Sequence, residues 1–549
     1  MITVATESLP QADAALAGVE VAIARRAFMQ VWRGACICAV VFGGTVASSA
    51  LSYAATFRTE GARHDLAAAT SADTGLAVLL GPVTSVDTVG GYTVYKCFVS
   101  LTTIGAIWAL LATTRLLRGE EDAGRWQLSL AGATRPAQST AATLLALGAA
   151  VGVVFLGTTL ATLAVGRSPD VDFGVGSTAL YGLSITIAPA VFVAVGACAS
   201  QLARTRRLAT GLGLVVFGIA FALRMLADSG PGTHWLLWAT PFGWTELLHP
   251  FTANDVRPLI PAGVAVGVLC LAAMVLAARR DSGAGTFATR DVRPPRGFGL
   301  RSSFGLAGRL DLPVLSAWCA AAAAAGLLLG VIAKMTSRSV PASLTDTLVK
   351  FGVHGSFASQ YFSVAFLLVA TLVALLPAGQ IASACEEELS GRLVNVLAGP
   401  VGKATWLGGR LLLASIGILA AGLLAGIASW VGAATQGVDI GLTTMLLAGV
   451  NVMPTALVTL GTGALVLSLA PRAAVGTVYG VVTWSMLVTF FSSLVSGMRS
   501  LDRLSLFHYM ALAPAQDPVP ATLAITTAAG VLLCAAAMLL ADRRDLWRT

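Results

Sequence analysis

The chain has 549 residues, of which 56% are hydrophobic and only 11% are charged, and its formal net charge is +8. An average soluble domain is roughly 25% charged, so this composition excludes an ordinary soluble protein and predicts a membrane protein. The positive charge does not indicate nucleic-acid binding, because the basic residues stand in short segments between apolar runs, where they set membrane topology. The runs are continuous and about 20 residues or longer, which favours an all-α polytopic bundle over a β-barrel.

The apolar runs predict twelve membrane-spanning helices in two groups of six. The first group covers residues 34–56, 92–117, 138–165, 177–202, 209–227 and 259–278. The second group covers residues 314–335, 358–382, 405–433, 441–470, 474–497 and 521–541. The predicted domains are an N-terminal interfacial helix (1–33), a first six-helix repeat (34–278), a cytoplasmic linker with a second interfacial segment (279–313), a second repeat (314–541) and a C-terminal tail (542–549).

The linker between the groups sets the predicted orientation. Residues 279–313 are rich in Gly, Pro and Ser and contain seven arginines, which places them in the cytoplasm. Because the number of spans is even in each group, both termini are then cytoplasmic. The first 33 residues are too polar for a cleavable signal peptide. Their last part is either an amphipathic helix in the cytoplasmic interface or a polar extension of the first span.

A charged motif after the second span returns in the second half of the chain. Residues 119–132 read GEEDAGRWQLSLAG and residues 386–399 read EEELSGRLVNVLAG, and both share E-E-x-x-G-R-x-x-x-x-L-A-G. The two Gly-Arg steps are 267 residues apart. Four further landmarks repeat in the same order: VDFG at 171–174 and VDIG at 438–441, Pro189 and Pro454, RRD at 279–281 and 543–545, and Pro241 and Pro514. We therefore expect two parallel repeats related by a pseudo-two-fold axis along the membrane normal.

Each copy of the motif is predicted to form a tight elbow on the cytoplasmic face. A Glu pair at a helix start would complement the helix dipole. The glycine that follows can adopt a left-handed conformation for a sharp turn. The apolar stretch after it would then form a short interfacial helix. Such an elbow is a candidate docking surface, and it occurs once in each half.

Two transporter families share parts of this pattern. Major-facilitator transporters also have twelve spans and an acidic-x-x-Gly-Arg motif, which residues 121–125 fit. Their pattern has a further Gly before the acidic residue and a further basic residue after the Arg, and both are missing here, while the doubled Glu is extra. An ion-driven secondary transporter of that type is therefore the alternative interpretation, and a catalytically silent membrane scaffold is a third.

The sequence more closely resembles the membrane subunits of type-two ABC exporters. The shared features are an amphipathic helix before the first span, the E-E-x-x-G-R motif, the segment ATPFGW within residues 233–251, and AARRDSGAG at 277–285. The last of these is similar to fused actinobacterial members that export polyketide antibiotics (tetronasin-like exporters). In the second half, the corresponding outer loop LSLFHYMALAPAQ lacks the Gly-Trp. The resemblance implies a permease in the bacterial plasma membrane that contains both halves of a translocation pathway.

No ATP site is predicted in this chain. A P-loop needs G-x-x-x-x-G-K-[ST], and the closest string, GPVGKATW at 399–406, lacks the first Gly and has Ala404 at the Ser/Thr position. The resemblance implies a separate cytoplasmic ABC ATPase, in two copies, that binds ATP and Mg. It assigns coupling to that ATPase to Glu120, Glu121, Gly124, Arg125, Glu387, Glu388, Gly391 and Arg392.

The resemblance also implies a central pathway lined by the second and fifth spans of each half, for hydrophobic small molecules. The aromatic candidates, proposed as a set, are Tyr95, Trp108, Phe217, Phe221, Tyr361, Phe362, Tyr479, Trp484 and Phe490. For any single one of them, packing against lipid or neighbouring helices is the favoured interpretation. The candidate outer gate is Trp235, Trp238, Pro241, Trp244, His508 and Pro514, for which an aromatic belt is the alternative. Arg224, near a membrane border, is expected to extend to water. The eight cysteines show no metal spacing, so no metal site is predicted.

Overall fold

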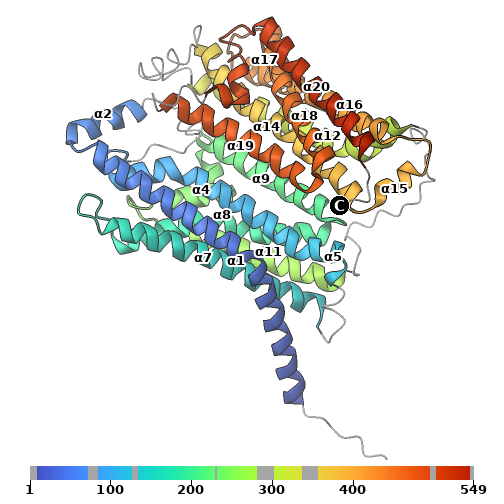
Figure 1. Cartoon of the computed structure of the whole chain (residues 1–549). Coiled ribbons are helices and arrows are strands. Elements are labelled where there is room, and N and C mark those ends of the chain that lie inside the picture. Colours follow the sequence, from blue (N-terminus) through green and yellow to red (C-terminus); the bar gives the residue numbers. More distant parts are fainter. Residues whose placement is uncertain are drawn as a thin grey trace, which may run out of the picture. The chain divides into compact units, whose positions relative to one another are not determined.

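The computed structural model describes residues 9–71, 85–126, 134–228, 232–280, 302–336, 357–494 and 502–544. Within these residues the chain forms helices joined by turns and no strand (Figure 1). Eleven helical stretches in the described residues are long and apolar enough to cross a membrane. These observations confirm the all-α polytopic fold. The predicted span at 474–497 is a helix, α19, but it is not among the eleven, so the number twelve stays a prediction.

The contacts divide the chain into two units, residues 1–291 and 292–549, and the division falls within the basic linker. Unit 1 contains α1 (Leu9–Thr56), α2 (Glu60–Ser71), α4 (Val89–Thr114), the π-helical turn η1 (Arg115–Gly119), α5 (Glu120–Asp122), α7 (Pro136–Gly166), α8 (Val175–Leu202), α9 (Arg206–Asp228), the 3-10 turn η2 (His234–Ala239), α10 (Pro241–Leu247) and α11 (Leu259–Arg279).

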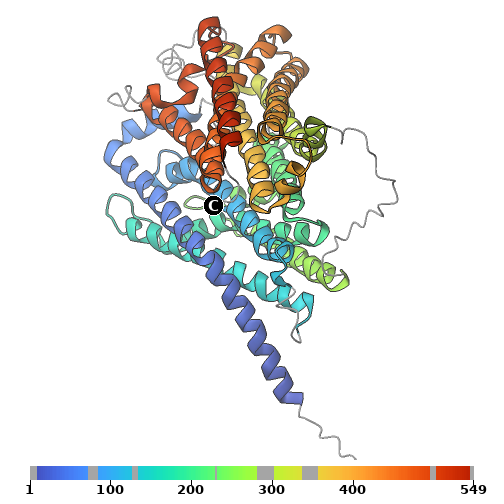
Figure 2. The same cartoon turned by 45° about the vertical axis from the view of Figure 1, so that its right-hand side comes forward.

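Unit 1 is held together by close helix pairs. α1 packs along α7, and α4 packs along α8 (Figure 1 and Figure 2). A Cβ added at Gly43 of α1 would lie 2.5 Å from the Cβ of Ala161 in α7, and one added at Gly157 of α7 would lie 2.6 Å from the Cβ of Ala39. Small residues therefore let these two helices approach closely, as is common in membrane bundles.

The N-terminal part of α1 is continuous with the first span. The helix runs without a break from Leu9 to Thr56, and its N-terminal end projects beyond the other helices of unit 1 (Figure 1). This continuity supports the alternative in which the polar stretch before residue 34 extends the first span.

Unit 2 has a similar but not identical order of elements. It contains α12 (Ser303–Thr336), α14 (Phe357–Leu389), α15 (Arg392–Leu397), α16 (Lys403–Thr435), α17 (Leu442–Asn451), α18 (Met453–Leu469), α19 (Pro471–Leu494), the 3-10 turns η3 (Asp502–Leu504) and η4 (Leu506–Tyr509), and α20 (Pro520–Arg543). α12 packs along α16, as α1 packs along α7. One difference concerns the repeated prolines: Pro189 lies inside the continuous α8, whereas Pro454 stands in the first turn of α18, directly after a break in the helix.

Candidate functional site

Both E-E-x-x-G-R motifs lie at the end of a helix and not at its start. In unit 1, α4 continues through η1 into α5, which ends the helix at Asp122. In unit 2, α14 ends at Leu389, so its last turn contains the glutamates. The prediction of a helix start was therefore wrong. A helix C-terminus carries a partial negative charge, so the dipole disfavours these carboxylates and other groups must neutralise them.

The sharp turn after the glutamates is confirmed in both copies. Gly124 has φ +72° and Gly391 has φ +73°, which is the left-handed region. A Cβ at either glycine would meet nothing within 4 Å, so the backbone conformation and not the available space requires glycine there. In unit 2 the short helix α15 follows directly. In unit 1, Arg125 and Trp126 are helical, and residues 127–132 of the motif lie outside the described residues.

Arginines neutralise the carboxylates of the first elbow. The Glu121 Oε2 atom lies 3.0 Å from Arg118 Nη1 and 2.7 Å from Arg280 Nη2. All three side chains are buried, with exposed fractions of 1% for Arg118, 7% for Glu121 and 8% for Arg280. Glu120 forms a two-point contact with Arg125, whose Nη2 is 2.7 Å and whose Nε is 2.8 Å from its carboxylate oxygens. This paired geometry is characteristic of strong arginine–carboxylate contacts.

The third acidic residue of this elbow connects it to the next helices. Asp122 Oδ1 lies 3.3 Å from Arg118 Nε, and Asp122 Oδ2 accepts a hydrogen bond of 2.6 Å from the backbone N–H of Arg206 at the start of α9. Arg118 also donates to the carbonyl oxygen of Arg204. The end of α5 is therefore fixed to the connection between α8 and α9.

The second elbow uses a different set of partners. Glu387 Oε2 accepts hydrogen bonds from Arg410 Nη2 at 2.8 Å and from the Trp406 indole Nε1 at 3.1 Å, both on α16. Glu388 pairs with Arg544, directly after α20. Burial lowers the pKa of the Arg544 guanidinium, but a guanidinium stays protonated in proteins. The charge on the inner side of this elbow is thus also compensated by arginine.

One ion pair occurs at equivalent positions in both units. Glu121 and Glu388 are equivalent residues of the two motifs, and their partners Arg280 and Arg544 are the second arginines of the two RRD segments. Two sequence landmarks that looked independent therefore meet in each unit. The arginine also reaches the end of the fourth span in both cases: Arg280 Nε donates to Gln201 Oε1 at 3.1 Å, and Arg544 Nη1 donates to the Leu467 carbonyl at 2.8 Å.

A second equivalence links the helix before each elbow to the same backbone position. Arg118 and Cys385 are 267 residues apart, as are Arg204 and Pro471. Arg118 donates to the Arg204 carbonyl, and the Cys385 thiol lies 3.2 Å from the Pro471 carbonyl. The contact is preserved although the side chain differs, which shows that the two elbows share a local architecture.

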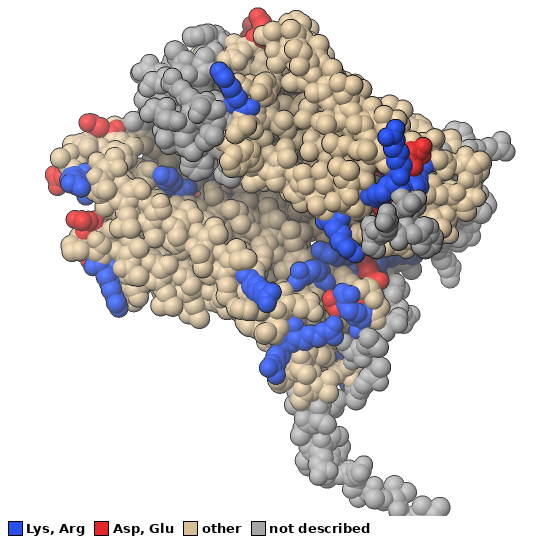
Figure 3. Space-filling model, in the orientation of Figure 1, with Lys and Arg blue, Asp and Glu red and all other residues tan. Residues whose placement is uncertain are grey.

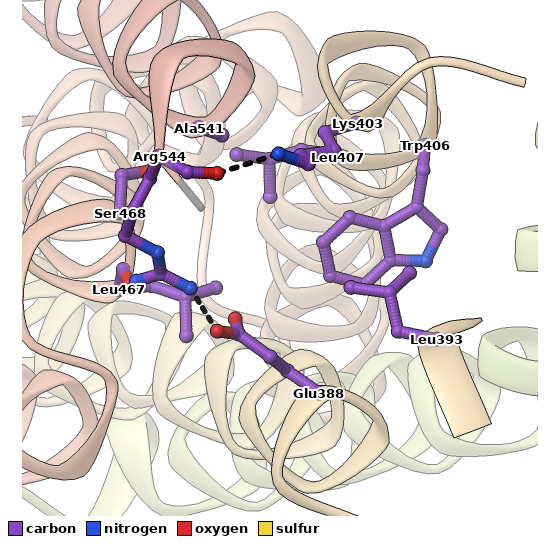
Figure 4. Close-up of a pocket in the computed structure, with 9 residues that line it drawn as sticks. All are labelled: Glu388, Leu393, Lys403, Trp406, Leu407, Leu467, Ser468, Ala541 and Arg544. Atoms are coloured by element: carbon purple, nitrogen blue, oxygen red, sulfur yellow. Dashed lines mark hydrogen bonds and ion pairs between the residues drawn. The ribbon is translucent and has the colours of Figure 1, made fainter. Parts of the chain in front are cut away.

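Charged atoms gather at the two elbows. On the face drawn in Figure 3, uncharged residues cover most of the helices, and charged atoms gather near α5 and α2 in unit 1 and near α15 in unit 2. A cavity of about 20 Å³ lies beside the second elbow, which is room for about one water molecule. In Figure 4, Arg544 points toward Glu388, while Lys403 points toward the backbone oxygen of Arg544, 2.5 Å away. This cavity is too small for a drug-sized substrate.

Each elbow has an outer side that remains accessible. Arg125 is 51% exposed in unit 1, whereas Arg392 and Glu386 of unit 2 are 62% and 71% exposed and pair at 2.8 Å. Apolar side chains stand beside them in unit 2, with Leu389 51% and Val394 43% exposed. Both elbows therefore combine anchored inner carboxylates with exposed charged groups, and the second elbow also exposes apolar side chains.

The aromatic residues proposed for the pathway differ in their surroundings in unit 1. Phe217 and Phe221 of α9 pack edge-on against Phe242 of α10, with ring centroids 5.3 and 5.5 Å apart. Trp108 lies against α1, where a Cβ added at Gly34 would be 2.8 Å from its Nε1. Tyr95 is half-buried. Here the structure brings together the two α9 phenylalanines and leaves Trp108 in a helix contact.

In unit 2 the candidates also separate into buried and exposed residues. Phe362 is completely buried in the core, and the Tyr361 hydroxyl donates to the Leu329 carbonyl at 2.8 Å. Tyr479 and Trp484 of α19 are 51% and 50% exposed. The side chain of Phe490 lies outside the described residues. Of the described pathway candidates in unit 2, Tyr479 and Trp484 are thus the two whose aromatic rings are exposed in the isolated unit.

The outer-gate candidates of unit 1 form a folded hairpin. Trp235 and Trp238 of η2 are 67% and 46% exposed, whereas Trp244 is buried and its Nε1 donates to the Trp238 carbonyl at 2.6 Å. Pro241 begins α10. In unit 2, the equivalent loop places His508 in η4, exposed and in edge-on contact with Tyr509, and leaves Pro514 half-buried.

A buried charge cluster near this hairpin was missed by the sequence reasoning. Arg224 was expected to reach water, but it is 1% exposed and lies 2.8 Å from Asp228 Oδ2 and 3.2 Å from Glu246 Oε2. The i,i+4 spacing of Arg224 and Asp228 is a local signal that could have identified the first pair. Nothing local points to Glu246, which comes from α10.

Comparison with known proteins places these elements among permeases. A family model described as "Multidrug efflux system permease Rv1217c, C-terminal domain" matches residues 17–278 and 300–540. The chain is also 31% identical over 373 residues to the multidrug efflux system permease protein Rv1217c of Mycobacterium tuberculosis (strain ATCC 25618 / H37Rv). That alignment covers 67% of the chain and 66% of the relative, so the chain spans just under two thirds of the relative's length. The two stretches matched by the family model contain the two elbows.

Proposed function

The chain belongs to this family of multidrug efflux permeases, and on that basis we propose that it is the membrane subunit of an ATP-driven ABC exporter. It moves hydrophobic or amphiphilic compounds outward across the bacterial plasma membrane, with both termini in the cytoplasm. The observation that carries the proposal is the pair of elbows, each with a left-handed glycine and arginine-bound carboxylates. A device that occurs once in each half fits a partner that binds in two copies.

In this proposal, a separate cytoplasmic ATPase binds ATP and Mg and contacts the outer side of each elbow. The exposed residues Arg125, Glu386 and Arg392 supply charged contacts, and Leu389 and Val394 supply apolar ones. Mixed surfaces of this kind are typical of protein interfaces. Movement of the ATPases displaces the elbows, and the inner carboxylates pass that displacement to the helices that they contact.

The substrate pathway is proposed to use the accessible aromatic residues of the fifth span of each half. Tyr479 and Trp484 expose about half of their surface, and Phe217 and Phe221 are half-buried. A pocket for amphiphilic compounds needs broad apolar walls with few polar groups. Phe362 is better assigned to the core of unit 2, because it has no exposed surface.

Transport by inside-out membrane vesicles tests the proposal against an ion-driven mechanism. Tagged protein isolated from its native host should bring down a soluble ATPase. Vesicles that contain both should accumulate a lipophilic dye when ATP is added, and vanadate should stop the accumulation. Vesicles without the permease are the control. The proposal is wrong if no ATPase co-purifies and if accumulation survives vanadate but collapses with an uncoupler.

A further inference from the structure

The arginine that follows the last helix of each half reaches the elbow of the same half. Arg280 directly follows α11 and Arg544 directly follows α20, and they contact Glu121 and Glu388 respectively. Among the ion pairs that the structure describes at the elbows, this is the one that both units build from equivalent residues. The other partners differ: Arg118 and Asp122 in unit 1 correspond to Cys385 and Leu389 in unit 2.

Among the candidate membrane spans identified in the described residues, the last one of each unit has the smallest buried share. Only 11% of the apolar segment of α11 is buried, compared with 78% for α8. The same value, 11%, applies to α20, compared with 67% for the stretch that contains α18. Each of these helices packs along the fourth span of its unit, and the approach of α20 to α18 is close: a Cβ added at Gly530 would lie 2.9 Å from Leu457. Most of their remaining surface is exposed, so the contact at one end is the point at which each helix is joined to the elbow.

The contact at that end is firm for a physical reason. In unit 1 it joins a carboxylate and a guanidinium that are both more than nine-tenths buried, and Arg280 donates from both Nη atoms, at 2.9 and 2.7 Å. Charge-assisted pairs of this geometry are among the strongest polar contacts in proteins. Separating such a buried pair leaves an uncompensated charge, so the elbow and the last helix are expected to move together.

We propose that Arg280 and Arg544 are positioning residues that tie the last helix of each half to its elbow, so that displacement of the elbow shifts α11 and α20. The proposal rests on the proposed function, because it assumes that an ATPase displaces the elbows. It adds which helices respond first and which side chains connect them. In this proposal the last helix of each half moves with the elbow, and the Glu–Arg pair is the contact that transmits the movement.

Charge reversal and charge exchange at this pair test the proposal in the assembled permease–ATPase complex. In vesicles, Arg280→Glu should lower the amount of dye transported per ATP hydrolysed by roughly tenfold, within the usual range of coupling between sites. The double variant Glu121→Arg with Arg280→Glu should restore only part of the loss, because the new arginine also lies beside Arg118. Arg279→Glu is the matched control, because Arg279 is the exposed neighbour in the same turn. Arg544→Glu, its exchange with Glu388→Arg, and the exposed control Arg543→Glu repeat the test in unit 2.

The outcomes separate this inference from the proposed function. If the ATPase binds and drives transport but Arg280→Glu and Arg544→Glu behave like their controls, the positioning role of the two arginines is refuted. The proposed function as an ATP-driven exporter is not affected by that outcome. Failure of the exchanged Glu388–Arg544 pair to restore transport per ATP also overturns the positioning role, because in unit 2 the position of Arg118 is occupied by Cys385. If no ATPase binds the wild-type protein, the proposed function itself fails. Should Arg280→Glu not insert, Arg280→Gln removes the guanidinium without adding a negative charge and is expected to show the same loss.

Discussion

The two elbows share one backbone turn but neutralise their carboxylates in different ways. In unit 1, three acidic residues end the helix, and the completely buried Arg118 lies among them. In unit 2, Cys385 and Leu389 take the places of Arg118 and Asp122, and Arg410 and Trp406 of α16 contact Glu387 instead. The comparison teaches that the turn and the contact with the last helix define the elbow, whereas the remaining counter-charges can be supplied from different helices.

The largest loss of stability is expected when Arg118 of the first elbow is replaced by cysteine, the residue at the equivalent position 385 of the second elbow. Arg118→Cys removes a guanidinium that contacts Glu121, Asp122 and the Arg204 carbonyl. Loss of one partner of a buried ion pair costs about 3 kcal/mol, and thermal unfolding of the purified protein in detergent should show it. The conservative Arg118→Lys should recover part of the loss. A variant as stable as the wild type would mean that Arg280 alone suffices for Glu121.

A smaller effect, equal in both halves, is expected at the turn glycines. Gly124→Ala and Gly391→Ala each force an L-residue into a left-handed conformation, which costs about 1–2 kcal/mol. Gly148→Ala in the middle of α7 is the control, because nothing lies within 4 Å of its added Cβ and alanine is favoured over glycine in helices. Unfolding midpoints measure both. A cost in one half only would contradict the shared turn.

The smallest effect is expected at the exposed pair of the second elbow. Glu386→Gln removes the partner of Arg392, but both side chains are more than 60% exposed, and such pairs contribute at most about 1 kcal/mol. The unfolding midpoint should therefore scarcely change. In the proposed interface, however, this variant should weaken binding of the ATPase in a pull-down at low salt. Unchanged binding there would remove Glu386 from the docking surface.

The sequence was sufficient to predict the fold class and the left-handed glycines. Continuous apolar runs predicted helices, and the glycine after each Glu pair predicted the turn. The prediction that the Glu pair begins a helix was wrong. Acidic residues are favoured at a helix start, and the arginines that stabilise them at a helix end come from distant positions in the chain. Arg280 is 159 residues from Glu121, so no local pattern connects them. The repeat of the RRD segment was visible in the sequence, but its contact with the glutamates of the elbow was not.

The first elbow also differs in the π-helical turn η1 that precedes it, which the described residues of α14 do not contain. A π turn closes its hydrogen bonds over one residue more than an α-helix does. Conversion of η1 to ordinary α-helix would therefore rotate everything after it by about one residue step, about 100°. The carboxylates of α5 would then turn away from Arg280 and Arg26. The hydrogen-bonding pattern of η1 thus determines which arginines the glutamates of the first elbow face, whereas a continuous α-helix leads into the second elbow.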